Sequence, residues 1–260
     1  YGYGNDVNDK CRGVRPALYL NLSSDMYSYA GTVCSDGTVN EQKKEETDNI
    51  ASPLQKSGEF KFETSLDNIV NTSGEDNKTA KYTYDYDENW FFTPSTTYQH
   101  ELTKMSIRAA MAGYGVMDAP HSVDTNIKYL MAGNDKNSLE FTNYESSYPD
   151  PKTNTIGYAI GSKNIKNSAG ETCSLLMVTV RGGGYMDEWG GNFDLGTKDE
   201  HQGFNEAALQ VRDGIKKYVE KYKDKLPYEL KVWISGYSRG AATTNLVAKM
   251  LDDGAIEGLT

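Results

Sequence analysis

The sequence is short of cysteine, histidine and tryptophan, with three of each in 260 residues. The cysteines, Cys11, Cys34 and Cys173, do not have the spacing of a metal site, which argues against a cysteine-ligated metal. Their number leaves a bridge between Cys11 and Cys34 open, but a chain of this length buries enough core to fold without one. We therefore expect neither a metal nor a cofactor.

Positive charge and long apolar runs are also scarce. Lysine and arginine number 27 against 37 acidic residues, which gives a formal net charge of −10. Binding to nucleic acid or to anionic lipid needs clustered positive charge, so neither is expected as a partner. No apolar run approaches the 18 residues or so that a membrane-spanning helix needs, and the most apolar stretch, residues 175–180, has the length of a buried strand. Stable membrane insertion is therefore not expected.

The beginning of the chain has neither an initiating methionine nor a signal peptide. This predicts a processed product or a fragment of a longer protein. Gly13-Val14-Arg15-Pro16-Ala17-Leu18 resembles the closing end of a domain of unknown function that recurs in bacterial surface proteins. Together with an acidic composition that includes 19 tyrosines, this resemblance favours an extracellular or cell-surface location in a bacterium.

Patterning along the chain predicts three parts. Residues 1–40 contain short alternating stretches and are interpreted as the remnant of a small β-rich module. Residues 41–58 are polar and highly charged, which is typical of a linker or a short solvated helix. Residues 59–260 form the main unit.

The end of the main unit alternates between strands and helices. Residues 174–180 are almost continuously apolar, which is typical of a strand covered on both faces. Apolar residues recur every three or four positions over 204–222, so this segment is predicted to be a helix. A strand over 230–234 and a helix over 241–251 follow. Strand–helix–strand order requires parallel pairing and predicts an α/β fold, with a mostly parallel sheet flanked by helices.

One motif lies at the last strand-to-helix turn. Gly236-Tyr237-Ser238-Arg239-Gly240 fits the pattern G-x-S-x-G, and in this position the pattern predicts a nucleophile elbow with Ser238 as nucleophile. Gly236 and Gly240 leave room for the sharp turn, and the backbone N–H of Arg239 becomes one donor to an oxyanion. The alternative is an ordinary glycine-rich turn in which the serine caps the helix.

A second glycine-rich loop follows the buried strand at residues 181–184. An oxyanion hole takes its second donor from a loop in this topological position, and the alternative is a flexible turn. With its surroundings, the loop is similar to the class 3 lipases of the α/β-hydrolase group. The similarity rests on four landmarks in order: Val180-Arg181-Gly182-Gly183, Glu188-Trp189, His201-Gln202-Gly203-Phe204 and the motif around Ser238. The resemblance covers residues 81–260 and implies hydrolysis of acyl esters by a serine nucleophile.

Two departures from the family pattern affect the expected chemistry. Gly183 stands where these lipases have threonine or serine, so only its backbone N–H is left as the second oxyanion donor. No histidine follows Ser238, since the three histidines are His100, His121 and His201. The resemblance implies that His201 has a structural role. The resemblance therefore implies that the catalytic aspartate and histidine follow residue 260, and that this part of a hydrolase fold is inactive alone.

These observations predict a secreted serine esterase or lipase of lipid metabolism, acting on an ester or lipid substrate. One alternative is a catalytically inactive hydrolase-like module used for binding or adhesion on a bacterial surface, which the glycine at position 183 favours. A second is an acyltransferase, which uses the same triad and differs in what deacylates the enzyme. Nothing in the sequence indicates a protein partner.

Overall fold

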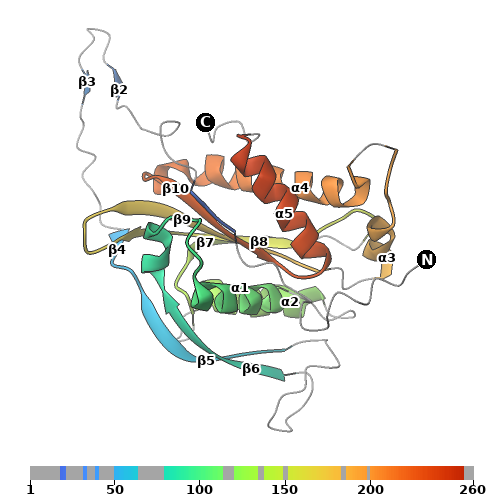
Figure 1. The fold of residues 1–260 in the computed structure, drawn as a ribbon, viewed down its shortest axis with the longest axis horizontal. Coiled ribbons are helices and arrows are strands. Elements are labelled where there is room, and N and C mark those ends of the chain that lie inside the picture. Colours follow the sequence, from blue (N-terminus) through green and yellow to red (C-terminus); the bar gives the residue numbers. More distant parts are fainter. Residues whose placement is uncertain are drawn as a thin grey trace.

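A computed structural model of the chain (Figure 1) describes residues 18–21, 32–33, 39–40, 50–63, 79–113, 120–133, 138–148, 152–182, 186–197 and 200–254. Its main sheet has six strands in two directions. The strands are β1 (Leu18–Asn21), β4 (Ile50–Ala51), β7 (Thr142–Ser147), β8 (Tyr158–Lys166), β9 (Thr172–Val180) and β10 (Leu230–Gly236). Their order is β1-β10-β9-β8-β4, and β7 also pairs with β8.

The parallel strand–helix–strand unit predicted at the end of the chain is confirmed. Helix α4 (Gln202–Tyr222) connects β9 to β10, which pair in parallel from Leu230↔Ser174 to Gly236↔Val180. β8 and β9 are joined by a tight turn at residues 167–171, and a short connection of this kind allows only antiparallel pairing. The fold is therefore α/β with a mixed sheet, in which β4–β8 is the second parallel pair.

Helices cover both faces of the sheet (Figure 1). Helices α1 (His100–Ala112) and α2 (Pro120–Ala132) lie on one face, and α4 and α5 (Arg239–Asp252) lie on the other. β10 is buried along its whole length. Trp233 belongs to the hydrophobic core on the side of α1, and Val232 and Ile234 belong to the core on the side of α4 and α5. This explains why the central strands are apolar on both faces rather than alternating.

Two short strands extend the sheet with residues from the N-terminal quarter of the chain. β1 lies within the predicted remnant 1–40 and pairs antiparallel with β10. β4 and the beginning of β5 (Gln55–Glu63) lie within the predicted linker 41–58. The division into three parts stays a prediction.

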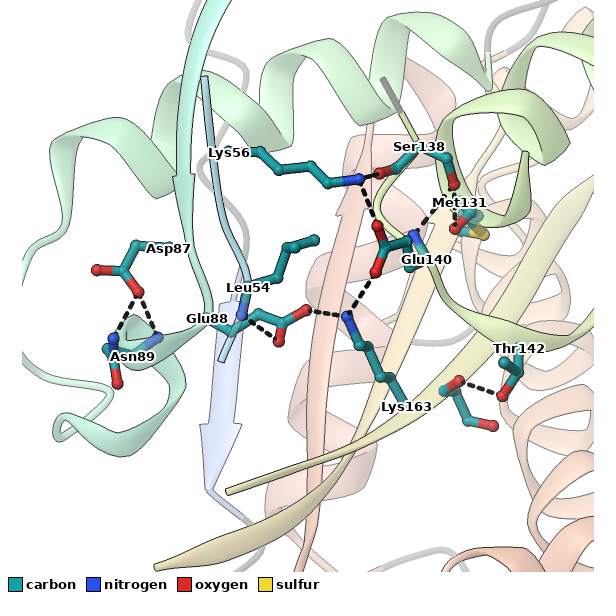
Figure 2. Close-up of polar contacts among 11 residues, drawn as sticks. Leu54, Lys56, Asp87, Glu88, Asn89, Met131, Ser138, Glu140, Thr142 and Lys163 are labelled. Carbon is teal, nitrogen blue, oxygen red and sulfur yellow. Dashed lines mark hydrogen bonds and ion pairs between the residues drawn. The ribbon is translucent and has the colours of Figure 1, made fainter. Parts of the chain in front are cut away.

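A hairpin of β5 and β6 (Thr79–Asp87) packs beside α1 and is fixed to the main sheet by ion pairs (Figure 2). Lys163 of β8 bonds to Glu88 at 3.0 Å, and the other carboxylate oxygen of Glu88 accepts the Leu54 N–H. Lys56 of β5 bonds to Glu140 at 2.7 Å. Burial raises the pKa of Glu88 above its ordinary value, and Lys163 opposes that shift. Lys163 also lies 3.9 Å from Glu140, so the two ion pairs form one connected network between the hairpin and β8.

Helix α1 is joined to β10 by a buried hydrogen bond, and its loss is expected to lower stability moderately. The indole Nε1–H of Trp233 donates to Ser106 Oγ at 2.9 Å. Ser106→Ala leaves this buried donor without its acceptor, so the free energy of unfolding should fall by about 1–3 kcal/mol in urea titrations. Thr103→Ala on the same helix is the control, because its hydroxyl bonds to Gln99 O of its own helix turn in a partly exposed position. Equal losses in both variants would contradict the prediction.

Candidate active site

The turn between β10 and α5 holds Ser238 in a backbone conformation that L-residues rarely adopt. β10 ends at Gly236 and α5 begins at Arg239, and between them Ser238 has φ 54° and ψ −121° with an exposed side chain. A conformation of this kind costs about 1–3 kcal/mol and persists only where the surrounding structure imposes it. We call residues 236–240 the elbow.

Two glycines allow the elbow to fit against the sheet. A Cβ on Gly240 would lie 2.5 Å from the carbonyl oxygen of Val180 and 2.7 Å from that of Arg181. A Cβ on Gly236 would lie 2.5 Å from the carbonyl oxygen of Gly240. In each case the obstacle is backbone, which a side-chain rotation cannot relieve. The two glycines of the sequence motif are therefore explained by the close passage of α5 over β9 and β10.

The Ser238 hydroxyl does not cap the helix that it precedes. Ser238 is the N-cap residue of α5, but its side chain accepts no hydrogen bond from the helix backbone. Its carbonyl oxygen instead accepts the N–H groups of Ala241 and Ala242, at 2.9 and 3.2 Å. The alternative of an ordinary capping serine therefore does not describe this turn. The hydroxyl is left exposed at a helix N-terminus, where a developing negative charge is favoured.

Arg239 has its backbone at the helix N-terminus and its side chain inside the protein. As the first residue of α5 its N–H has no partner within the helix. Arg239 is 2% exposed, and its guanidinium donates to Asn192 Oδ1 and to the carbonyl oxygen of Gly203, both at 3.1 Å. Burial lowers the pKa of this arginine from its ordinary value, and the carboxylate of Glu188 opposes the shift.

The loop after β9 is tied to its own beginning by a buried ion pair. Arg181 and Glu188 are both fully buried and bonded to each other, and Glu188 belongs to the short helix α3 (Met186–Trp189). Burial raises the pKa of Glu188, and Arg181 opposes the shift most strongly. The predicted oxyanion donor Gly183 lies between these two residues and outside the described residues.

Residues 178–256 match the family model described as Lipase (class 3). The match extends from β9 beyond α5 and includes the Arg181–Glu188 pair, α4 and the elbow. Over these residues the chain is similar to the class 3 lipases. No curated protein and no solved structure matched the chain in the other two comparisons.

Within the lipase-like region, His201 has the structural role that the sequence predicted. Its Nδ1 accepts the Phe204 N–H at the beginning of α4, and its Nε2 lies 3.1 Å from the carbonyl oxygen of Asn192. His100 is exposed at the beginning of α1, where it contacts the Tyr98 hydroxyl. The side chain of His121 lies outside the described residues. In the described part of the chain, no histidine bonds to Ser238.

The side-chain partners of the lipase-like site were not found by sequence reasoning. Glu188 was noted only as a landmark and Arg239 only for its backbone N–H. A signal for Arg239 was present, because Arg239, Thr243 and Val247 recur every four residues on the buried face of α5. A charged residue on such a face must have buried partners. Periodicity does not say which residues these are.

A pocket of about 470 Å³ lies at the edge of β8, between β7 and β4, and no residue of the elbow lines it. It is lined by Ile50, Ala51, Glu140, Thr142, Asn143, Ser162, Lys163, Asn164 and Lys225.

Among the described residues, no cluster of three or more histidine, cysteine or acidic side chains is arranged to hold a metal ion. Of the helices in the described ranges, none has both the length and the apolar character needed to cross a bilayer.

Proposed function

We propose that this chain is part of a serine esterase or lipase that hydrolyses acyl esters, with Ser238 as the nucleophile. The observation that carries the proposal is the exposed, uncapped hydroxyl of Ser238 at a strained turn inside the region that matches the class 3 lipases. Strain of this kind is concentrated at functional sites.

In the proposed reaction, Ser238 Oγ attacks the carbonyl carbon of the ester and its proton passes to a general base. The negative charge that develops on the carbonyl oxygen is stabilised by the backbone N–H of Arg239 and, on the other side, by that of Gly183. Each such donor contributes about 10²- to 10³-fold in rate. The alcohol leaves with a proton from the base, and water then releases the acid. We propose that the base and its orienting carboxylate are a histidine and an aspartate downstream of residue 260.

The substrate class follows from the same proposal: it is an ester or lipid whose carbonyl carbon can reach the exposed Ser238 side chain. An extracellular or cell-surface location in a bacterium is proposed on composition, because the chain is acidic and rich in tyrosine. Neither proposal requires a cofactor, since the serine mechanism uses protein groups and water alone.

The test is covalent labelling of the full-length protein with a fluorophosphonate, followed by peptide mass spectrometry. Labelling should map to Ser238 and disappear in Ser238→Ala. Absence of labelling in the wild type would overturn the proposal and favour an inactive binding or adhesion module. If Ser238 is labelled, product analysis with an added alcohol acceptor separates hydrolysis from acyl transfer.

A further inference from the structure

We infer that the Arg239 side chain is a positioning residue that ties the elbow to the beginning of α4. The inference rests on the proposed function, because what it positions is the Ser238 hydroxyl and the Arg239 N–H. Its two hydrogen-bond acceptors come from different elements: Asn192 from the short helix η3 (Gly190–Asn192) and Gly203 from the first turn of α4. One guanidinium therefore joins three segments of the chain.

The surroundings of the guanidinium are built closely around it, and we call Gly191, Asn192, Gly203 and Phe204 the cradle. A Cβ on Gly191 would lie 2.8 Å from both terminal nitrogens of Arg239. A Cβ on Gly203 would lie 2.0 Å from the carbonyl oxygen of Gly191. The obstacle at Gly203 is backbone, so glycine there lets α4 approach η3, whereas at Gly191 the nearest atoms are the ends of the Asn154 and Arg239 side chains. The terminal nitrogens of Arg239 are therefore closely packed against η3.

A second layer holds the cradle in place. The ring of Phe204 lies 5.5 Å from the guanidinium carbon and stacks on His201, with centroids 4.1 Å apart. His201 in turn contacts the carbonyl oxygen of Asn192. Asn154, whose Oδ1 would lie 2.5 Å from a Cβ on Gly191, donates to both Asp194 and Glu206. The segments that carry the two acceptors of Arg239 are thus held in place by further contacts of their own.

Fixing the elbow matters for the chemistry because the same residue supplies a backbone donor. The ends of helices tend to fray. At the beginning of α5 the side chain of Arg239 opposes fraying, because it is bonded to Asn192 and Gly203. Misplacement of a reacting group by about 1 Å can cost roughly 10²-fold in rate. Loss of the anchor should therefore slow the covalent step while leaving substrate binding unchanged.

The test compares Arg239→Met, Arg239→Lys and the control Arg212→Met in the full-length protein. Methionine keeps an apolar stem without donors, and lysine keeps the charge without the planar fork. Arg212 lies on α4, is partly exposed and bonds to the adjacent Asp213. We expect the maximal rate of fluorophosphonate labelling to fall by about 10- to 100-fold in Arg239→Met. The half-saturating probe concentration should stay the same, Arg239→Lys should recover part of the rate, and Arg212→Met should match the wild type.

Hydrogen exchange provides a readout that does not depend on activity. Arg239→Met should speed exchange over residues 190–205 and leave residues 211–222 unchanged. Asn192→Ala should do the same with Arg239 intact, which keeps the inference testable if Arg239→Met does not fold. An unlabelled wild type overturns the proposed function, while the exchange data still show whether the tie exists. If the wild type is labelled, an unchanged maximal rate in the variants, or a weaker binding of the probe in place of a slower rate, overturns the positioning role.

Discussion

Ser238→Ala is expected to abolish ester hydrolysis by the full-length protein, with kcat lower by about 10⁶-fold. The methyl group cannot form the acyl-enzyme, and the oxyanion donors alone leave only a small residual rate. Alanine should leave the fold intact, because the Ser238 hydroxyl makes no hydrogen bond to the helix that it precedes. Initial rates on a short-chain ester, with circular dichroism as the check on folding, measure both expectations.

Ser238→Gly separates the chemical role of this residue from its structural cost. Glycine also removes the hydroxyl, but it adopts positive φ readily, so it relieves the strain at φ 54°. The glycine variant should therefore be inactive and more stable than the alanine variant by about 1 kcal/mol, after the entropic cost of glycine. Equal unfolding free energies for the two variants would show that the turn is not strained.

Breaking the buried ion pair between Arg181 and Glu188 is expected to have the largest effect on stability. Arg181 and Glu188 are bonded to each other and fully buried. Arg181→Met leaves a buried carboxyl without its strongest charge partner, which should lower the free energy of unfolding by about 3–5 kcal/mol. Arg181→Met with Glu188→Leu removes both charges and should recover most of the loss. A double variant no more stable than the single one would contradict this account.

The decrease in the free energy of unfolding caused by Arg181→Met should depend on pH. Burial already raises the pKa of Glu188 above its ordinary value of 4.5, and without Arg181 the pKa in the folded protein rises further. The unfolded chain keeps the ordinary value. The contribution of Glu188 to the stability of Arg181→Met is therefore most favourable below pH 4.5. It is lost as the pH rises through the pKa of Glu188 in the folded variant. Urea titrations should show a larger difference from the wild type at pH 7 than at pH 4, and a difference independent of pH would argue against Glu188 as its cause.

The sequence by itself determined those features that depend on local pattern and order. The apolar period of residues 204–222 and the buried run at 174–180 predicted α4 and β9, and their order required the parallel pairing with β10. The G-x-S-x-G motif could be placed at a strand-to-helix turn for the same reason. The four landmarks led to the class 3 lipases, and the family model matches the region that contains them.

Only the tertiary structure decided how distant segments meet. The motif predicted a sharp turn at Ser238, but the backbone groups of β9 that Gly240 approaches, the carbonyls of Val180 and Arg181, are seen only in the structure. Arg239 bonds to Asn192 and to Gly203, 47 and 36 residues away, and no periodic pattern relates these positions. β1 joins β10 across more than 200 residues because the edge of that strand is open to pairing. Local pattern fixes which face of an element is buried, whereas its partners depend on long-range packing.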